Sequence, residues 1–444
     1  ASPVKFTPPV EAAREMVKLL REKEKVEMVI CLSHSGVYEG TKSEDEVLAR
    51  EVKGIDIIIS GHTHTLLEKP LIVNGTIIVQ AWEYGRRVGV LDVAWDKGRA
   101  TVKDYSMITI DDSIPADPDI QRRINGYIGE IDRRVLAEHG LSYWKTIAHA
   151  KFDMPIVEDE SPLGNLIADS IRWYANKYDY DPADPATKVV LAIEANGVIR
   201  DSLMKGKTGR LSVADVFRTI PLGIGMDGTM AYPLVSCYLY GSEIKKAMEI
   251  LTSIYPLKGS SYFLQISGVK FTYNPRRAIF DRVTDIWMGS EEEGYVPLDY
   301  SSSNKALYRI SGNIYDTTFL KVIGSFTFNI LNIVPKDRKG NPISDLVAYR
   351  IDADKRKPGI QELKEWVGVM EYIKSFPDID GDGIPDVPEK YSGKLGRIVS
   401  EPSLNPFNLL SRGTMVTWVM FGVFVLLAAL IALVVRFFVK KIRK

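Results

Sequence analysis

Three of the five histidines follow apolar, strand-like runs of sequence. His34 follows VEMVICL, while His62 and His64 follow IDIIIS within the motif GHTH. A strand that ends in a glycine turn places the next side chains at the carboxyl edge of a sheet, where α/β proteins bind ligands. Imidazole nitrogen suits borderline cations such as Zn²⁺, Mn²⁺ and Fe²⁺. We therefore predict that these three histidines bind transition metal, with backbone capping by His34 as the alternative. His139 and His149 lie in other settings and are expected to be incidental.

A second group of possible ligands lies in the acidic run DIDGDGIPDVPE, which has the oxygen spacing of a calcium loop. Side-chain oxygens fall at loop positions 1, 3, 5, 9 and 12, and Gly383 stands at position 6. Hard oxygen ligands with a glycine for the sharp turn suit Ca²⁺. A helix is expected before the loop, but prolines break any helix after it. We predict a calcium site that stiffens a stalk, with a solvated acidic turn as the alternative; its ligands are Asp378, Asp380, Asp382, Asp386 and Glu389.

The C-terminal region predicts a membrane anchor. Residues 415–435 form a run of 21 residues without a charge. A helix of that length rises about 31 Å, enough for a hydrocarbon core of about 30 Å. A buried core helix is disfavoured because the run is apolar on every face and little sequence follows it. Because the tail is basic, the positive-inside rule predicts a single-pass cell-membrane protein with an extracytoplasmic body and a cytoplasmic tail. The tail's cations are Arg436, Lys440, Lys441, Arg443 and Lys444.

Composition narrows the class of protein. The chain has 444 residues, 45% of them hydrophobic, and 57 basic residues balance 57 acidic ones. This is ordinary globular composition and excludes a disordered chain, a collagen or a coiled coil. Zero net charge argues against a nucleic acid polymer as partner. Cys31 and Cys237 are too few for a disulfide framework.

Helices and strands alternate in two regions, which predicts an α/β fold class. In the first region, apolar strands are expected at 26–32, 55–60, 76–81 and 88–94, with helices at 10–22 and 44–53 and a possible hairpin partner at 98–110. Continuous apolar strands between helices imply a sheet covered on both faces. The second α/β region begins near residue 148. Its strands are expected at 188–192 and 234–239, its helices at 164–176, 213–220 and 241–251, and strand-rich sequence runs to about 352. A separate amphipathic helix is expected at 362–376.

These patterns divide the chain into seven segments. The first region and a polar linker helix are followed by the second region, the calcium loop with its helix, a stalk, the membrane helix and the tail. We place the segments at 1–112, 113–147, 148–352, 353–400, 401–414, 415–435 and 436–444.

Several motifs resemble one enzyme family. The sequence from VKFTPPVEAAREMVKLL through ICLSHSG, IISGHTH and QAWEYGRRVGVLDV resembles the second half of the catalytic domain of 5′-nucleotidases, which are calcineurin-like metallophosphoesterases. SPLGNLIADSIR, EANGVIRDSL, LSVADVF, GSEIKKAMEI and FLQISGVKFTYNP resemble that family's C-terminal substrate domain. The similarity covers residues 4–330. It implies part of a metallophosphoesterase β-sandwich flanked by helices, then a second α/β substrate domain.

The resemblance also implies roles for single residues. Two divalent transition metals (Zn, Mn or Fe) would clamp a phosphoester and activate water. By motif, His34 and His62 would ligate one metal and His64 the other. Asn196 and Arg200 of NGVIR match residues that face the phosphate and sugar. A surface ion pair is the alternative for Arg200.

Departures from the family pattern are equally specific. Neither the Asp-x-His strand end nor Gly-Asn-His-Glu occurs, so we expect no catalytic residue in this chain. We expect a companion polypeptide to carry the N-terminal half, since half a sandwich would expose apolar strand faces. Val157 stands where the family has an arginine, and Leu222 where it has a stacking aromatic. Tyr315 or Phe319 could supply a stacking face, but core positions are favoured.

The leading hypothesis is therefore a membrane-anchored, extracytoplasmic, metal-dependent phosphoester hydrolase of the 5′-nucleotidase type, of which this chain is the C-terminal part. Its partners would be the companion polypeptide, membrane lipid and a nucleotide or other phosphoester. The alternative is a non-catalytic, membrane-tethered accessory or structural subunit that keeps the fold. A relative acting on a sulfur ester or another anion is a third possibility, because the same metal geometry serves related hydrolyses.

Overall fold

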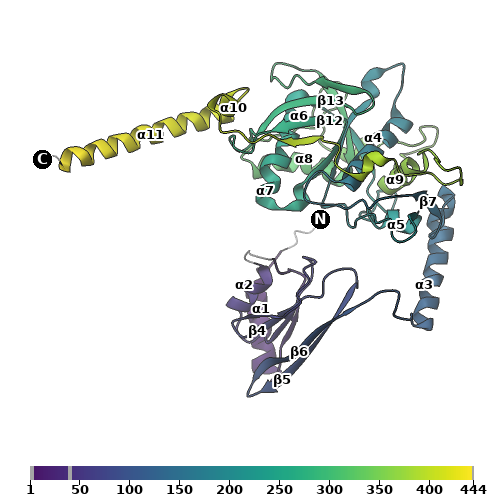
Figure 1. Cartoon of the computed structure of the whole chain (residues 1–444), viewed down its shortest axis with the longest axis vertical. Helices are drawn as coiled ribbons and strands as arrows, with labels where there is room; N and C mark the ends of the chain where they lie inside the picture. The colour runs from purple at the N-terminus through teal and green to yellow at the C-terminus, as the bar shows by residue number, and fades with distance from the viewer. Residues whose placement is uncertain (1–4, 39–42, 443–444) are drawn as a thin grey trace. The chain divides into compact units, whose positions relative to one another are not determined.

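The computed structural model describes residues 5–38 and 43–442, and the chain forms two compact units (Figure 1). Unit 1 comprises Ala1–Gly126 and unit 2 comprises Tyr127–Lys444. The boundary falls within α3 (Pro118–Ile131), which lies in the predicted linker helix. Two residues of the predicted basic tail, Arg443 and Lys444, lie outside the described residues.

Unit 1 contains a four-stranded sheet in the order β1-β2-β4-β3, in which β1, β2 and β4 are parallel and β3 is antiparallel. A long antiparallel hairpin, β5–β6, follows it. The predicted strands, helices and hairpin are thus present, and β3 is an additional strand. The elements are α1 (Pro9–Lys18), β1 (Ile30–Leu32), α2 (Glu44–Glu51), β2 (Ile57–Ile59), β3 (Leu71–Val73), β4 (Thr76–Val79), β5 (Arg87–Asp96) and β6 (Arg99–Thr109).

The two faces of this sheet are covered unequally. Ile58 and Ile78 are fully buried in a cluster with side chains of α1 and α2. On the opposite face, Ile57 packs with side chains of the β5–β6 hairpin. Leu32 of the edge strand β1 points to this second face and is 79% exposed. The prediction of cover on both faces therefore holds at Ile57 but is wrong for Leu32 and for Ile59, which is 46% exposed, because the hairpin does not cover that end of β1 and β2.

Unit 2 is built on two four-stranded sheets. One has the order β10-β15-β8-β11 and the other β14-β13-β12-β16, and a short pair, β7–β9, lies apart from both. Figure 1 shows the helices of unit 2 around these sheets. The strands are β7 (Thr146–His149), β8 (Val189–Ala195), β9 (Arg210–Ser212), β10 (Leu234–Tyr240), β11 (Leu264–Ser267), β12 (Val269–Tyr273), β13 (Val283–Ser290), β14 (Gly294–Pro297), β15 (Leu307–Asn313) and β16 (Ile398–Ser400).

Helix α4 begins in a buried part of unit 2. Ser161 caps it by accepting a hydrogen bond from the backbone N–H of Gly164 at 3.1 Å, and Pro162 begins its first turn. The helix then packs its apolar side chains into the core. The helices of unit 2 include α4 (Pro162–Asp179), α5 (Val213–Phe217), α6 (Gly241–Glu249), α7 (Tyr255–Lys258), α8 (Ile314–Phe326), α9 (Glu365–Lys374), α10 (Pro406–Leu410) and α11 (Met415–Ile442).

Helix α8 corrects the prediction that the sequence up to about residue 352 is strand-rich. Its segment, IYDTTFLKVIGSF, is rich in β-branched and aromatic residues, which favour strands. Asn313 nevertheless caps a helix there, because its side chain accepts the backbone N–H of Asp316 at 2.9 Å. Leu320 and Ile323 lie in the core on one face, so tertiary packing overrides local preference.

Residues 391–400 are integral to unit 2. Tyr391 and Arg397 are almost fully buried, and β16 pairs in parallel with β12. The Arg397 guanidinium contacts Asp169 at 2.9 Å and Glu291 at 2.8 Å. The segment 401–414, predicted as a stalk, is also held along part of its length, because Arg277 Nη1 donates to two of its backbone carbonyls.

Helix α11 contains a stretch, Met415–Val439, that is long and apolar enough to cross a membrane, by length and composition. Its large apolar side chains are exposed, as the predicted anchor requires. Membrane insertion itself is part of the proposal below.

Candidate functional site

The ends of β1 and β2 bring two of the predicted histidines together. The strands are parallel with Leu32 opposite Ile59, so the loops that follow leave the sheet at the same level. The ring centroids of His34 and His62 lie 5.1 Å apart, with their planes at 59°. Both side chains are exposed, so a ligand could reach them.

A buried carboxylate holds the two histidine loops in place. Asp45 of α2 is fully buried, and it accepts hydrogen bonds from the hydroxyls of Ser33 and Ser60, each at 2.5 Å. Ser33 directly precedes His34, and Ser60 lies two residues before His62. Asp45 also accepts the backbone N–H of Gly36 at 3.1 Å. This role could not be predicted from the sequence, because Asp45 lies in an ordinary acidic first turn of a helix.

The turns around the histidines have unusual backbone conformations. His62 and His64 have φ of 68° and 52°, in the left-handed region that non-glycine residues seldom occupy. Such conformations cost on the order of 1 kcal/mol each and occur often at functional sites. Gly36 is required at φ 95°, because a Cβ there would lie 2.1 Å from the methyl group of Thr63.

His64 has different neighbours from the other two. Its Nδ1 atom lies 3.0 Å from a carboxylate oxygen of Glu83, and its ring meets Tyr84 edge-on at 5.1 Å. Within the described part of unit 1, no three ligand atoms from His, Cys, Asp or Glu lie within 4.8 Å of one another. The residues present thus offer two adjacent imidazoles and a third held by an acid, which is a partial donor set for borderline divalent cations.

Asn196, a predicted substrate-facing residue, directly follows β8 in unit 2. Its Nδ2 atom donates to the carbonyl of Val157 at 2.8 Å, and its Oδ1 accepts from Gln265 at 2.8 Å. Both ends of the amide are therefore oriented, while one N–H and one lone pair have no partner among the residues that the structure describes. Arg200, the second predicted residue, is exposed, and its backbone N–H donates to Thr219 at 2.7 Å.

A cavity of about 300 Å³ is lined by Ala195 and Gly197, the two residues on either side of Asn196 in the sequence. Tyr232 and Tyr315 also line it, and their rings stack with centroids 5.6 Å apart and planes at 20°. Tyr315 is 55% exposed, so the core position favoured for it is wrong. Its place at the start of α8 explains the difference, since the first turn of that helix faces the cavity.

Comparisons with known proteins identify the domains to which these residues belong. Residues 146–317 match the model of the 5′-nucleotidase C-terminal domain, and residues 3–66 match part of the calcineurin-like phosphoesterase model. The chain therefore contains a 5′-nucleotidase C-terminal domain. Its similarity to the trifunctional nucleotide phosphoesterase protein YfkN of Bacillus subtilis is 29% identity over 314 residues, covering 69% of this chain and 19% of that protein. It is 28% identical over 281 residues to the 5′-nucleotidase of Bos taurus, covering 59% of this chain and 46% of the relative.

The chain spans about half, or less, of the length of these curated 5′-nucleotidase relatives. Among solved structures, it resembles a 5′-nucleotidase precursor from Thermus thermophilus with a TM-score of 0.59 and 26% identity, covering 90% of this chain and 69% of that one. It also shares the fold of the sulfate thiohydrolase SoxB from Thermus thermophilus, with a TM-score of 0.55 and 18% identity, covering 90% of this chain and 59% of that one.

Three buried carboxylic acids lie behind the cavity of this 5′-nucleotidase domain. Asn313 Nδ2 donates to Glu194 at 2.9 Å, and Asp316 accepts the backbone N–H of Ala195 at 2.7 Å. Burial raises the pKa of Asp316 and that of Glu365 to about 7 each. Burial and the neighbouring acids also raise the pKa of Glu194 well above its ordinary value. The sequence did not suggest this cluster, because the three residues come from distant segments.

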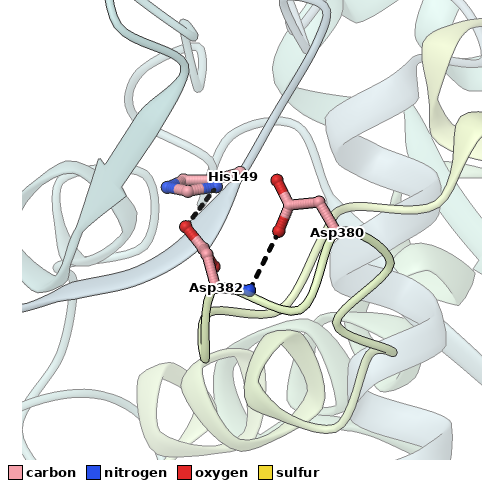
Figure 2. Close-up of side chains that lie close together, drawn as sticks. All are labelled: His149, Asp380 and Asp382. Carbon is pink, nitrogen blue, oxygen red and sulfur yellow. Dashed lines mark hydrogen bonds and ion pairs between the residues drawn. The ribbon is translucent and has the colours of Figure 1, made fainter.

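The acidic loop brings together four of the five predicted calcium ligands. Ligand atoms of Asp378, Asp380 and Asp386 lie within 4.8 Å of one another, and so do those of Asp380, Asp382 and His149. Figure 2 shows the Asp382 carboxylate beside the His149 ring, with Nδ1 and Oδ2 3.6 Å apart. Glu389, the fifth predicted ligand, is exposed and belongs to neither group of described ligand atoms.

His149, which was expected to be incidental, lies beside the acidic loop. Its backbone N–H donates to Pro385 and its carbonyl accepts from Val387, both at 2.8 Å, so β7 holds the end of the acidic loop. Its Nε2 atom is buried without a hydrogen-bond partner among the described residues. Sequence separation of more than 200 residues concealed this contact.

Proposed function

We propose that this chain is part of a membrane-anchored, extracytoplasmic, metal-dependent phosphoester hydrolase of the 5′-nucleotidase type. The observation that carries the proposal is the 5.1 Å pairing of His34 and His62 at coincident strand ends in a chain that contains a 5′-nucleotidase C-terminal domain. The matched domain supplies the reaction class, and the pair supplies a place for metal in this chain.

In this proposal His34 and His62 hold one divalent transition metal and His64 takes part in holding a second. Zn²⁺, Mn²⁺ and Fe²⁺ all accept imidazole nitrogen. When bound, such a metal pair lowers the pKa of water and neutralises charge on the phosphoester. The chain's own residues position the donors: Asp45 ties both histidine loops, and Glu83 orients His64.

The substrate would be a nucleotide or another phosphoester. Asn196 is oriented by two hydrogen bonds and keeps polar capacity, and exposed Arg200 offers a planar fork that matches phosphate oxygens. The cavity lined by Ala195 and Gly197 has stacked tyrosine rings on its wall, which suits a flat organic group. The names of the curated relatives, nucleotide phosphoesterase and 5′-nucleotidase, support the nucleotide class.

We also propose that a polypeptide with the N-terminal half of the phosphoesterase domain packs on unit 1. Leu32 is 79% and Ile30 50% exposed on the edge strand β1. A parallel edge strand with apolar side chains and unpaired backbone groups is a surface that proteins normally cover. Such a partner would supply the ligands and the catalytic residue that this chain lacks.

Two further features complete the proposal. The loop with Asp378, Asp380 and Asp386 binds Ca²⁺, and α11 spans the cell membrane with the basic tail in the cytoplasm. A calcium ion bound there would hold the loop against β7. Oxygen ligands and the glycine turn support Ca²⁺ over a transition metal there.

The decisive experiment combines metal content with activity. The full chain is purified from membranes with whatever polypeptide accompanies it, and it is assayed for bound transition metal and for hydrolysis of 5′-nucleotides. We expect about two transition metals per complex. His62→Ala should lower metal occupancy and hydrolysis at least about tenfold, while the control His139→Ala should leave both unchanged. Absence of transition metal and of hydrolysis in the wild-type complex would reject the proposal.

One observation favours a non-catalytic accessory subunit as the second candidate. Val157, which stands where the family has an arginine, lies next to Asn196, because its carbonyl accepts the Asn196 amide. Because valine stands there in place of an arginine, the region expected to face the substrate has one positive charge fewer than in the family. A complex that holds Ca²⁺ but no transition metal would support this second candidate.

A further inference from the structure

A large cavity lies beside the first turns of α11. Its volume is about 880 Å³, within the range of about 300–1,000 Å³ that is usual for ligand pockets. One wall consists of Val416, Val419 and Met420 from α11. The facing wall comes from the body of unit 2 and includes Phe280 and Ile330. The cavity is therefore bounded by both the apolar helix and the folded domain.

The start of α11 is fixed to the domain by a buried acid. Asp281 is fully buried, and its Oδ2 atom accepts the backbone N–H of Thr414 and the hydroxyl of Thr417, each at 2.6 Å. Its Oδ1 atom accepts from Lys245 Nζ at 2.7 Å. These charge-assisted bonds, together with those of Arg277 to the preceding segment, hold the helix start in one position. The cavity therefore lies where several hydrogen bonds hold the start of α11 against the body of unit 2.

The length of α11 indicates how deep in a membrane this cavity would lie. The 25 apolar residues of Met415–Val439 extend about 37 Å, against a hydrocarbon core of about 30 Å. Trp418 lies near the domain end of the helix, where aromatic residues gather at the membrane interface. In a spanning α11 the turns that line the cavity therefore lie at the boundary between headgroups and hydrocarbon.

The chemistry of the walls changes across the cavity. Ile279, Phe280, Ile330 and Leu331 provide apolar surface, while Ser301 and Ser302 provide hydroxyls. Lys245 and Glu249, which also line it, are paired at 3.1 Å and offset each other's charge. Lys246 Nζ donates to the uncharged carbonyl of Asn332 at 3.0 Å, and burial lowers the pKa of this lysine. Arg412 adds a second cation at the rim, paired with Asp285.

We infer that this cavity binds one anionic phospholipid, with an acyl chain against Val416, Val419 and Met420 and the phosphate near Lys246 and the serine hydroxyls. The inference rests on the proposed membrane anchoring, because only a spanning α11 places the cavity at lipid depth. A phospholipid fits because it is the one abundant molecule there that joins an apolar chain to an anion. The bound lipid would fill the space between helix and domain and set the height of unit 2 above the bilayer.

The test uses the full chain in lipid nanodiscs made of equal parts phosphatidylglycerol and phosphatidylcholine. Native mass spectrometry after release from the nanodiscs counts the lipids that stay bound. We expect one retained phosphatidylglycerol on the wild type. Val419→Trp, which fills the cavity, should lower its retained fraction at least fivefold. Val425→Trp makes the same change on α11 at a residue that does not line the cavity, and should retain lipid as the wild type does.

Further variants keep the test independent of folding and of anchoring. Ser302→Trp blocks the cavity from the domain side, and Lys246→Gln should abolish the preference for phosphatidylglycerol over phosphatidylcholine. Resistance of the chain to alkaline extraction from membranes is measured in parallel. Loss of that resistance in the wild type contradicts the anchoring itself. Full resistance with equal lipid retention in the wild type, Val419→Trp and Ser302→Trp contradicts the lipid site alone.

Discussion

The buried carboxylate of Asp45 accepts the hydroxyl of Ser60 at 2.5 Å, and through this bond a helix positions the loop that carries His62. The other carboxylate oxygen accepts Ser33 beside His34 in the same way. One acid on α2 therefore sets the spacing of both candidate metal ligands. This relationship makes Asp45 a positioning residue that acts through the two serines.

Replacing Asp45 should disturb the histidine pair and the fold of unit 1 together. Asp45→Asn leaves a buried donor where two hydroxyls donate, so we expect a loss of about 1–3 kcal/mol in the free energy of unfolding. Transition-metal affinity should fall as well. Glu51→Gln on the same helix is the control, because Glu51 makes only an exposed pair with Arg14. Denaturant unfolding and metal titration check the two effects, and wild-type metal affinity in Asp45→Asn would contradict the positioning role.

The buried acids behind the cavity predict a pH-dependent stability. The pKa of Glu365 is raised to about 7 by burial, against an ordinary value of about 4.3 in the unfolded chain. The folded chain then binds more protons than the unfolded chain between these values, so the free energy of unfolding falls as pH rises from about 5 toward 7. For Glu365 the loss amounts to at most about 4 kcal/mol.

Glu365→Gln should remove that part of the pH dependence, so that the variant gains stability relative to the wild type at pH 8 but not at pH 5. Glu371→Gln on the same helix α9 is the matched control, because Glu371 pairs with Lys177 at the surface. Chemical unfolding at several pH values measures the difference. Equal pH profiles for the two variants would show that Glu365 does not titrate as the buried cluster requires.

Calcium should stabilise unit 2 through the acidic loop. At a Ca²⁺ concentration a hundred times Kd, binding adds about 2.7 kcal/mol to the free energy of unfolding. Asp380 contributes to both groups of clustered ligand atoms, so Asp380→Asn should abolish the rise in Tm that Ca²⁺ gives over a chelator. Asp354→Asn, at an exposed acidic turn, should leave the rise intact. A thermal shift that is the same in Asp380→Asn as in the wild type would exclude the loop as the calcium site.

Arg397 should matter for the stability of the whole of unit 2, because it joins the segment before the membrane helix to the core. Its removal leaves Asp169 buried with an uncompensated charge, and such losses cost about 3–5 kcal/mol. Arg397→Met is the variant that keeps most of the side-chain volume. Lys394→Ala, which breaks an exposed pair with Asp159, should cost at most about 1 kcal/mol. If both variants unfold at the same denaturant concentration, the segment behaves as a free stalk.

The sequence alone determined the features that depend on residues close together in the chain. Apolar runs predicted the strands of unit 1, the spacing of apolar residues predicted most helices, and the uncharged run predicted α11. The end of a strand is visible in sequence, so the adjacency of His34 and His62 could also be predicted. The acidic loop was recognisable because its ligands are close together in the chain.

Only the tertiary structure decided which distant residues meet. Asp45 accepts hydrogen bonds from serines in two loops, and His149 lies beside Asp382, more than 200 residues away in the sequence. Glu194, Asp316 and Glu365 come from separate elements and form one buried cluster. Helix α8 formed against its local preference because a cap and a core were available to it. The physical reason is common to all of these: burial and hydrogen bonding depend on neighbours in space, and the order of residues along a chain specifies those neighbours only after it has folded.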